Sequence, residues 1–306
     1  MFSPSECEMQ KVAVREAAAL SLCIGGIDIA LVSGDPELRV AVQRTAQGFL
    51  VNACAADARV SAAWGELRHP AGDRMFDSGA LWRLFRQDGD YVFDFTTPMF
   101  GPVPYKRARF NRDFTCGEVF LHRDYFARGE PAFPLEYPLD EILMTNLLAR
   151  GRGIEVHACG VRDSDGRGYL FLGQSGDGKT TTARLWEKDK GVLILSDDRI
   201  ILRCLDGKMW MYGTPWHGEA ELGCSARTPL TEIFFLGRGA GNQTVPLRQP
   251  EAVARLVARS FIPFYDAAGL DFTLEFLERV TKAVPCAELR FVPDGRVVDF
   301  VRSGNR

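Results

Sequence analysis

The chain has 306 residues and a mass of 34.0 kDa, with 46% hydrophobic, 25% charged and 11% aromatic residues. These fractions exclude a collagen-like, low-complexity or broadly disordered chain, and the length suggests about two domains. The 37 basic and 40 acidic side chains give a net charge of −3, so no overall positive field attracts nucleic acid or an anionic membrane.

The start of the chain and its cysteines favour a cytoplasmic location. Residues 1–11 lack the basic start and apolar run of a secretory signal. The apolar stretch 12–30 is interrupted by Arg15, Glu16 and Asp28, which is not the pattern of a membrane span. The 8 cysteines are scattered without a Cys-x-x-Cys pair, and we expect most of them to be reduced and buried.

The first half of the chain is rich in strand signals. Residues 17–29 and 36–49 mix helix and strand patterns, and only the Asp-Pro-Glu run that opens the second of them indicates a helix start. Aromatic runs on both sides of an Asp-Gly pair at 88–89 predict a hairpin over 81–95. Residues 107–120 are typical of one or two further strands.

A basic run, Lys106-Arg107-Ala108-Arg109, lies between Tyr105 and Phe110. Basic and aromatic residues together could bind nucleic acid, but a short charged strand edge is commoner. We therefore expect no nucleic-acid partner.

The best helix signal covers 138–150. Acidic residues occupy its first turn, leucines and isoleucine share one face, and Gly151 ends it. Because the pattern changes there, we expect a strand-rich α+β domain over 1–137 and a second domain over 138–306. In the second domain we expect strands at 154–161, 168–172, 192–195 and 233–236, a hairpin turning at 206–207, helices at 251–261 and 272–284, and a closing hairpin over 289–300 that turns at 294–295.

The segment from Gly173 to Thr180 matches G-x-x-x-x-G-K-[ST], the phosphate-loop or Walker A pattern, at every fixed position. It follows an apolar strand, 169–172, and precedes a predicted helix, 181–188. The glycines let backbone N–H groups approach phosphate oxygens, and the helix N-terminus adds a favourable dipole. Lys179 can reach the β- and γ-phosphates, and the Thr180 hydroxyl can ligate Mg²⁺. The residues expected to bind ATP are Gly173, Ser175, Gly176, Asp177, Gly178, Lys179, Thr180 and Thr181.

A second signal is the acidic pair Asp197-Asp198, directly after the apolar strand at 192–195. Carboxylates at a strand end beside a phosphate loop can hold Mg²⁺ and accept a proton. On its own, such a pair suits a turn equally well. A strand closely precedes the loop strand, and a hairpin directly follows the acids, which predicts a mixed, partly antiparallel sheet.

Together these segments resemble the HPr kinase/phosphorylase and phosphoenolpyruvate carboxykinase superfamily, in which a histidine-bearing strand precedes the phosphate loop and an Asp-Asp pair follows it. The helix at 139–149 and the segment 213–218, Gly-Thr-Pro-Trp-His-Gly, resemble the HPr-kinase-like serine kinases. The resemblance is good over 138–201 and weaker beyond it. It is carried by residues 154–161, 173–182 and 195–198.

The resemblance implies a role for each of three residues. Asp197 matches the general base that takes the proton of an attacking serine hydroxyl, and Asp198 matches a metal-binding carboxylate. His157 matches a histidine that hydrogen-bonds the catalytic Asp in the kinases and ligates a metal in the carboxykinases. The family includes hexamers, so a homo-oligomer is also implied.

Two features of the family are missing. The glycine-rich signature segment of HPr kinase/phosphorylases is not found after the acidic pair, which argues against phosphorolysis and against HPr as the partner. The arginine-rich organic-acid site of the carboxykinases is not recognisable either. Decarboxylation of oxaloacetate is therefore not expected.

Three charged residues, Glu219, Glu221 and Arg227, follow the turn at 216–218. One of them could contact the metal or the transferred phosphoryl group, where an arginine stabilises developing charge. A solvated loop is the alternative for each of them, and His217 best fits a turn residue.

The sequence thus predicts a Mg²⁺–ATP-dependent kinase that phosphorylates a hydroxyl group, best a serine of a protein or peptide. One alternative is a small-molecule kinase of the same fold, and another is a nucleotide-binding scaffold whose catalysis has lapsed. The intact Lys179, Thr180 and acidic pair argue against a lapsed site. The first domain is expected to recognise the acceptor or a partner.

Overall fold

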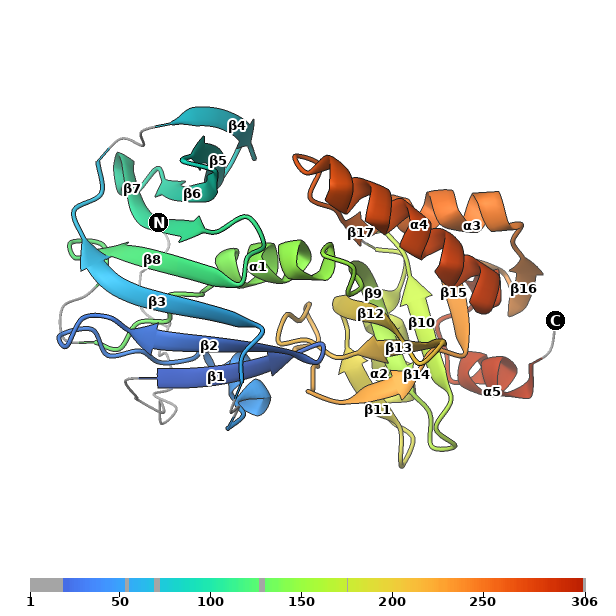
Figure 1. Cartoon of the computed structure of the whole chain (residues 1–306). Coiled ribbons are helices and arrows are strands. Elements are labelled where there is room, and N and C mark those ends of the chain that lie inside the picture. The colour runs from blue at the N-terminus through green and yellow to red at the C-terminus, as the bar shows by residue number, and fades with distance from the viewer. Residues whose placement is uncertain (1–18, 53–54, 69–71, 127–129, 175, 305–306) are drawn as a thin grey trace, which may run out of the picture.

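The computed structural model describes residues 19–52, 55–68, 72–126, 130–174 and 176–304. In these ranges the chain forms two sheets with helices beside them (Figure 1). Both sheets contain parallel and antiparallel strand pairs. The protein is therefore a mixed α/β structure, as expected. No helix in the described part of the chain is long and apolar enough to cross a membrane.

The first sheet has the strand order β1-β2-β3-β8-β7-β6-β5-β4. Its strands pair antiparallel except at β2–β3 and β3–β8, which are parallel. The elements are β1 (Ala19–Ile24), β2 (Ile27–Ser33), a short 3-10 helix η1 (Arg44–Phe49), β3 (Ala58–Gly65), β4 (Asp73–Asp77), β5 (Trp82–Gln87), β6 (Asp90–Thr97), β7 (Gly101–Phe110) and β8 (Cys116–His122).

The predicted hairpin over 81–95 is confirmed as β5–β6. Asp88 and Gly89 both have positive φ, 53° and 90°, as a tight primed turn requires. The helix start indicated at 35–37 is wrong, because Asp35 accepts the backbone N–H of Glu37 in a turn and no helix begins there. Asp and Pro favour turns as well as helix starts.

The basic run lies on β7, an interior strand between β6 and β8, so the expected strand edge is wrong. Its charges are neutralised locally. Arg107 pairs with Asp94, and Arg109 Nε donates to an Asp90 carboxylate oxygen at 2.7 Å. These arginines therefore hold β6 and β7 together.

The predicted helix at 138–150 is confirmed as α1 (Leu139–Leu148), and Gly151 with φ 85° follows it. Leu139, Leu143 and Leu147 are buried in the same core as the strands of the first sheet. That core also includes Ile201 and other side chains from the second half. Helix α1 thus lies between the sheets and packs them together (Figure 1).

The second sheet has the order β14-β13-β12-β9-β10-β15-β18-β16. Strand β9 is its centre: its first part pairs with β12 and β17, and its last part pairs with β10 and β11. The strands are β9 (Ile154–Arg162), β10 (Gly168–Leu172), β11 (Leu193–Ser196), β12 (Arg199–Leu205), β13 (Lys208–Tyr212), β14 (Arg227–Pro229), β15 (Glu232–Arg238), β16 (Gln243–Pro246), β17 (Ser260–Phe261) and β18 (Cys286–Phe291).

Helices cover both faces of this sheet (Figure 1). Helices α3 (Gln249–Val257) and α4 (Ala267–Ala283) pack on one face, and α2 (Lys179–Trp186) and α5 (Arg296–Ser303) pack on the other. Burial on both faces explains the continuous apolar pattern of β10, whose five residues are all buried.

Two predictions for this half need correction. The helix expected at 251–261 ends at Val257, and the chain then forms the short strand β17. The closing hairpin over 289–300 is wrong, because the Asp294-Gly295 pair precedes helix α5. The Asp294 carboxylate accepts the backbone N–H of Arg296 at the start of that helix. An aspartate that caps a helix and one that opens a turn look alike in sequence.

Candidate functional site

A polar cavity of about 450 Å³ lies at the edge of the second sheet, where β11 ends and α2 begins. It collects residues that are far apart in the sequence. Strand β9, the loop before α2, the turn after β11 and the segment after β13 all contribute to it. The lining residues are His157, Gly176, Gly178, Lys179, Thr180, Thr181, Asp197, Asp198, Gly218 and Glu219.

The loop between β10 and α2 has the strand–loop–helix arrangement that its sequence predicts. Gly178 has a φ of 108°, and a Cβ there would lie 3.0 Å from Cζ of Phe291. Only glycine suits this position at the start of α2. Within the loop, the Asp177 carboxylate accepts the backbone N–H of Gln174. Asp177 thus braces the loop rather than lining the cavity.

Lys179 is the first residue of α2 and is 7% exposed. Its Nζ donates to the carbonyl oxygens of Gly173 at 2.8 Å and of Gln174 at 3.2 Å. Burial lowers the pKa of Lys179, and the nearby carboxylates of Asp198 and Asp177 oppose this shift. The ammonium is therefore held at the cavity wall among groups that favour its charge. Ser175, the remaining predicted loop residue, lies outside the described residues.

Asp197 is held by two backbone amides. Its Oδ1 accepts the N–H of Gly218 at 2.9 Å, and its Oδ2 accepts the N–H of Ala220 at 2.9 Å. A Cβ on Gly218 would lie 3.0 Å from Oδ2, so the lack of a side chain permits this approach. Each carboxylate oxygen keeps a second lone pair. Asp197 makes no ion pair among the described residues.

The segment that supplies these amides is fixed by three side chains. Ser196 Oγ donates to the Trp216 carbonyl at 2.9 Å, and Thr214 Oγ1 donates to the Arg199 carbonyl at 2.7 Å. The Trp216 indole N–H donates to a carboxylate oxygen of Asp140 on α1 at 2.8 Å. Burial raises the pKa of Asp140 to about 7, although this hydrogen bond opposes the shift. The segment 213–218, singled out in the sequence, thus orients Asp197.

Asp198 is the acid that pairs with histidine. His157 Nε2 lies 2.7 Å from Asp198 Oδ1, and Arg199 pairs with Oδ2. Burial alone would raise the pKa of Asp198. The hydrogen bond from His157 and the positive charge of Arg199 outweigh burial, so its pKa lies below the usual value. The prediction that His157 orients Asp197 is therefore wrong, because the turn after β11 points the second acid, not the first, toward β9.

Of the three charged residues singled out after this segment, only Glu219 lines the cavity. Glu221 forms an exposed ion pair with Arg44 at 3.0 Å. Arg227 stacks over Trp210, with Cζ 4.8 Å from the ring centroid. Neither of these two reaches the candidate site.

An arginine that the sequence did not indicate, Arg259, lies close to the site but does not line the cavity. Its backbone carbonyl accepts the N–H of His157 at 2.7 Å, and its Nε is buried without a hydrogen-bond partner. Its charge contributes to the lowered pKa of Lys179. The pairing of β17 with β9 brings it here, and a two-residue strand gives almost no sequence signal.

The donor set fits a Mg²⁺ ion that is shared with phosphate oxygens. Thr180 and Asp198 both line the cavity, and the lowered pKa of Asp198 keeps its carboxylate ionised. No cluster of three or more His, Cys, Asp or Glu that could hold a metal occurs in the described ranges. Mg²⁺ at nucleotide sites uses one or two carboxylates, with phosphate and water as the other ligands.

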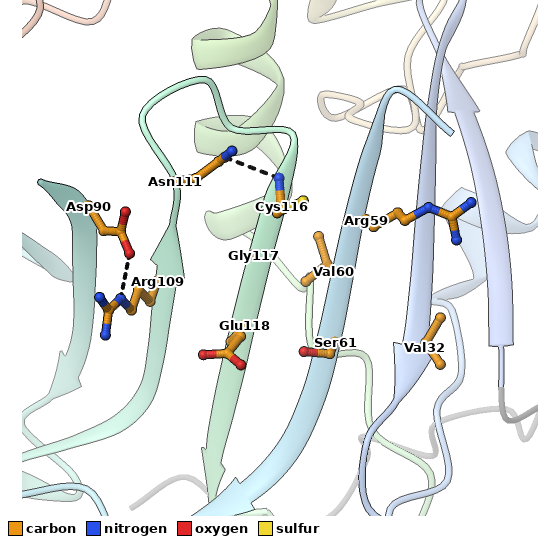
Figure 2. A pocket seen from close by; sticks show the side chains of 10 residues that line it. All are labelled: Val32, Arg59, Val60, Ser61, Asp90, Arg109, Asn111, Cys116, Gly117 and Glu118. Carbon is orange, nitrogen blue, oxygen red and sulfur yellow. Dashed lines mark hydrogen bonds and ion pairs between the residues drawn. The ribbon is translucent and has the colours of Figure 1, made fainter. Parts of the chain in front are cut away.

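A second cavity, of about 480 Å³, lies on the first sheet over β2, β3, β8 and β7 (Figure 2). Asp90 and Arg109 in its wall pair with each other, and the Asn111 side chain accepts the N–H of Cys116. It lies on the flat of the sheet, away from any helix N-terminus of the described structure. Its geometry does not suit a nucleotide.

No protein-family model matches the chain, and no curated protein matches it. Among solved structures, that of the HPr(Ser) kinase/phosphatase from Coxiella burnetii is similar at 12% sequence identity, with a TM-score of 0.28. The similar region covers 49% of this chain and 91% of that chain. A similarity at this score carries no argument about activity, so the function has to be inferred from the site itself.

Proposed function

We propose that the protein is a Mg²⁺–ATP-dependent phosphotransferase that moves the γ-phosphoryl group of ATP to a hydroxyl group. The observation that carries this proposal is the convergence of Lys179, Thr180, Asp197 and Asp198 around one cavity of about 450 Å³. A loop lysine and threonine at a helix N-terminus suit triphosphate and Mg²⁺, and two acids in the same lining suit a metal and a proton.

Asp197 is the proposed base. When the acceptor oxygen attacks the γ-phosphorus, its proton passes to Asp197, and the bond from the γ-phosphorus to the bridging oxygen breaks to release ADP. Asp197 suits this role because two amides fix it while a lone pair remains on each oxygen. Asp198 is less suited to it, because His157 and Arg199 already compensate its charge.

Lys179 and Arg259 neutralise the charge of the phosphoryl group during transfer. Lys179 would exchange its loop carbonyl partners for phosphate oxygens, and the nearby positive charge of Arg259, which already acts on Lys179, would add to the neutralisation. Bound Mg²⁺, on Thr180 and Asp198, would add charge neutralisation at the phosphates. The protein's contribution is mainly positioning and electrostatic stabilisation.

We propose a serine of a protein or peptide as the acceptor, as in HPr-kinase-like kinases. The support is the sequence resemblance over 138–201, together with the position of the segment 213–218 on Asp197. In this proposal residues 1–137 recognise the acceptor or a partner, the protein acts in the cytoplasm, and it assembles as a homo-oligomer, as the resemblance implies.

The test incubates the purified protein with γ-labelled ATP, Mg²⁺ and a nucleotide-depleted lysate of the source organism. We expect label on an acceptor with the wild type and none with Asp197→Asn. Label on macromolecules supports the protein kinase, whereas label on small solutes would indicate the small-molecule kinase. Bound ATP with no Asp197-dependent transfer to either fraction would contradict the enzyme and favour a nucleotide-binding scaffold.

A further inference from the structure

A third cavity, of about 280 Å³, lies between the two halves of the chain, and nearly half of its lining residues are aromatic. Phe76 of β4 and Trp82 of β5 line it from the first sheet, and Phe261 and Tyr265 line it from the second half. The rings of Phe76 and Trp82 lie 5.9 and 6.4 Å from that of Tyr265, centroid to centroid. We call this space the aromatic pocket.

Arg199 lies between the aromatic pocket and the candidate site and contacts residues of both. Glu141, which lines the pocket, accepts Arg199 Nε at 2.7 Å. Cζ of Arg199 lies 4.4 Å from the ring centroid of Phe261, and another guanidinium nitrogen of Arg199 pairs with Asp198. One arginine thus backs the pocket on one side and holds a site acid on the other.

The backbone links the two places as well. Strand β17 runs antiparallel to β9, so Arg259 lies beside His157 at the site and Phe261 lies opposite Glu155 at the pocket. Two extended residues span about 7 Å. A peptide bound across Arg199 could therefore reach both the site and the pocket within a few residues.

The pocket suits an uncharged group, because Arg199 already neutralises its one lining acid, Glu141. The apolar surface also continues past the cavity. Tyr137 and Phe264, at its rim, are 54% and 67% exposed. A small molecule of the cavity's size would leave these rings in water, whereas a peptide chain could cover them.

We infer that the aromatic pocket recognises an apolar side chain of a peptide or protein acceptor, a few residues from the hydroxyl that receives the phosphoryl group. The position of that hydroxyl rests on the proposed function. Binding of the apolar side chain in the pocket does not rest on the proposed function, because binding occurs without phosphoryl transfer.

The test uses fluorescein-labelled peptide pools with a central serine and with Phe, Leu, Lys or Asp fixed at one position within about four residues of it. Binding is measured by fluorescence anisotropy with the Lys179→Met variant, so that the measurement reports peptide binding without phosphoryl transfer. At one or two positions, we expect the Phe and Leu pools to bind about tenfold more tightly than the Lys and Asp pools.

Two exposed rim variants, Phe264→Ala and Tyr137→Ala, should reduce this preference severalfold without affecting the fold. Val245→Ala is the matched control, because Val245 is also exposed but lies on β16, the last strand in the order of the second sheet and not part of the pocket (Figure 1). Equal binding of all pools, or a preference that both rim variants retain, would overturn the inference. N-acetyl-phenylalaninamide binding as tightly as the best pool would overturn the peptide as occupant.

Transfer is then measured separately with γ-labelled ATP, Mg²⁺ and protein with Lys179 intact. Label on the serine of the preferred pool supports both proposals. A pool that binds through the pocket but stays unlabelled would count against the kinase and leave the pocket assignment standing.

Discussion

Two buried lysines, Lys106 on β7 of the first sheet and Lys179 at the start of helix α2 beside the second sheet, face different surroundings. Lys106 on β7 is fully buried, with Nζ 4.9 Å from the ring centroid of Phe95 and 3.0 Å from the Glu136 carbonyl. Among the described residues, Lys179 has only backbone carbonyls of its own loop as hydrogen-bond partners, and it lines a cavity. Lys106 is enclosed by packing, whereas Lys179 can exchange its partners for a ligand.

The same difference extends to the neighbouring charges. In the first sheet, Arg107 and Arg109 each have an acid on the adjacent strand, so these charges serve the fold. At the edge of the second sheet, Asp197 is positioned by amides and forms no ion pair within the described part of the chain. A charge that is fixed but uncompensated is available for chemistry.

The largest expected effect is that of Lys179→Met. Loss of the ammonium should lower phosphoryl transfer roughly a thousandfold, because its charge acts on the transferred group. The urea midpoint should change little, because Lys179 makes no contact that links distant segments. A transfer rate within tenfold of the wild type would show that Lys179 does not act on phosphate.

The second largest effect is expected for Asp197→Asn. Its phosphoryl transfer should fall about a hundredfold or more, because the amide cannot accept the proton. Its oxygen can still accept one backbone N–H, so ATP affinity should stay within a few-fold of the wild type. Asp198→Asn, the matched change, should instead weaken Mg²⁺ binding and so raise the Mg²⁺ concentration that half-maximal transfer requires. If Asp198→Asn abolished transfer and Asp197→Asn did not, the roles of the two acids would have to be exchanged.

A smaller loss, about tenfold, is expected for Gly218→Ala. The added Cβ would lie 3.0 Å from Asp197 Oδ2 and displace the carboxylate by a few tenths of an ångström. Gly241→Ala is the control, since a Cβ at Gly241 meets nothing within 4 Å. Steady-state rates of phosphoryl transfer are measured for both variants. Equal rates would mean that the position of Asp197 does not limit transfer.

Lys106→Met should leave transfer unchanged and alter only the pH dependence of stability. Burial lowers the pKa of Lys106 from 10.5 to about 8. Between these values the unfolded chain binds the extra proton, so the free energy of unfolding should rise by about 3 kcal/mol from pH 8 to 10.5. Urea unfolding at both pH values should show this rise in the wild type and lose it in Lys106→Met. An equal rise in both proteins would contradict the assignment.

The local parts of this fold follow from sequence, and the long-range parts do not. The strand and helix that flank the loop 173–178, the helix over 138–150 and the hairpin at 88–89 are each specified by adjacent residues, and the structure shows each of them. The parallel pairing of β2 with β3 and β8 depends on segments far apart in the chain. No periodicity encodes which strands become neighbours.

The candidate site divides in the same way. The residue types at 157, 179, 197 and 198 indicated a shared site, and the structure brings them around one cavity. The partner of His157 depends on how a two-residue turn rotates, so the sequence assigned it to the wrong acid. Arg259 arrives through strand β17, and only tertiary pairing could reveal it.

The most direct test of the central claim is calorimetric titration of ATP, with and without Mg²⁺, into the wild type and Lys179→Met. The loop, Thr180 and Asp198 predict binding that Mg²⁺ strengthens and that Lys179→Met weakens at least tenfold. Absence of ATP binding by the wild type, or equal binding by both proteins, would contradict a nucleotide site at this edge of the second sheet.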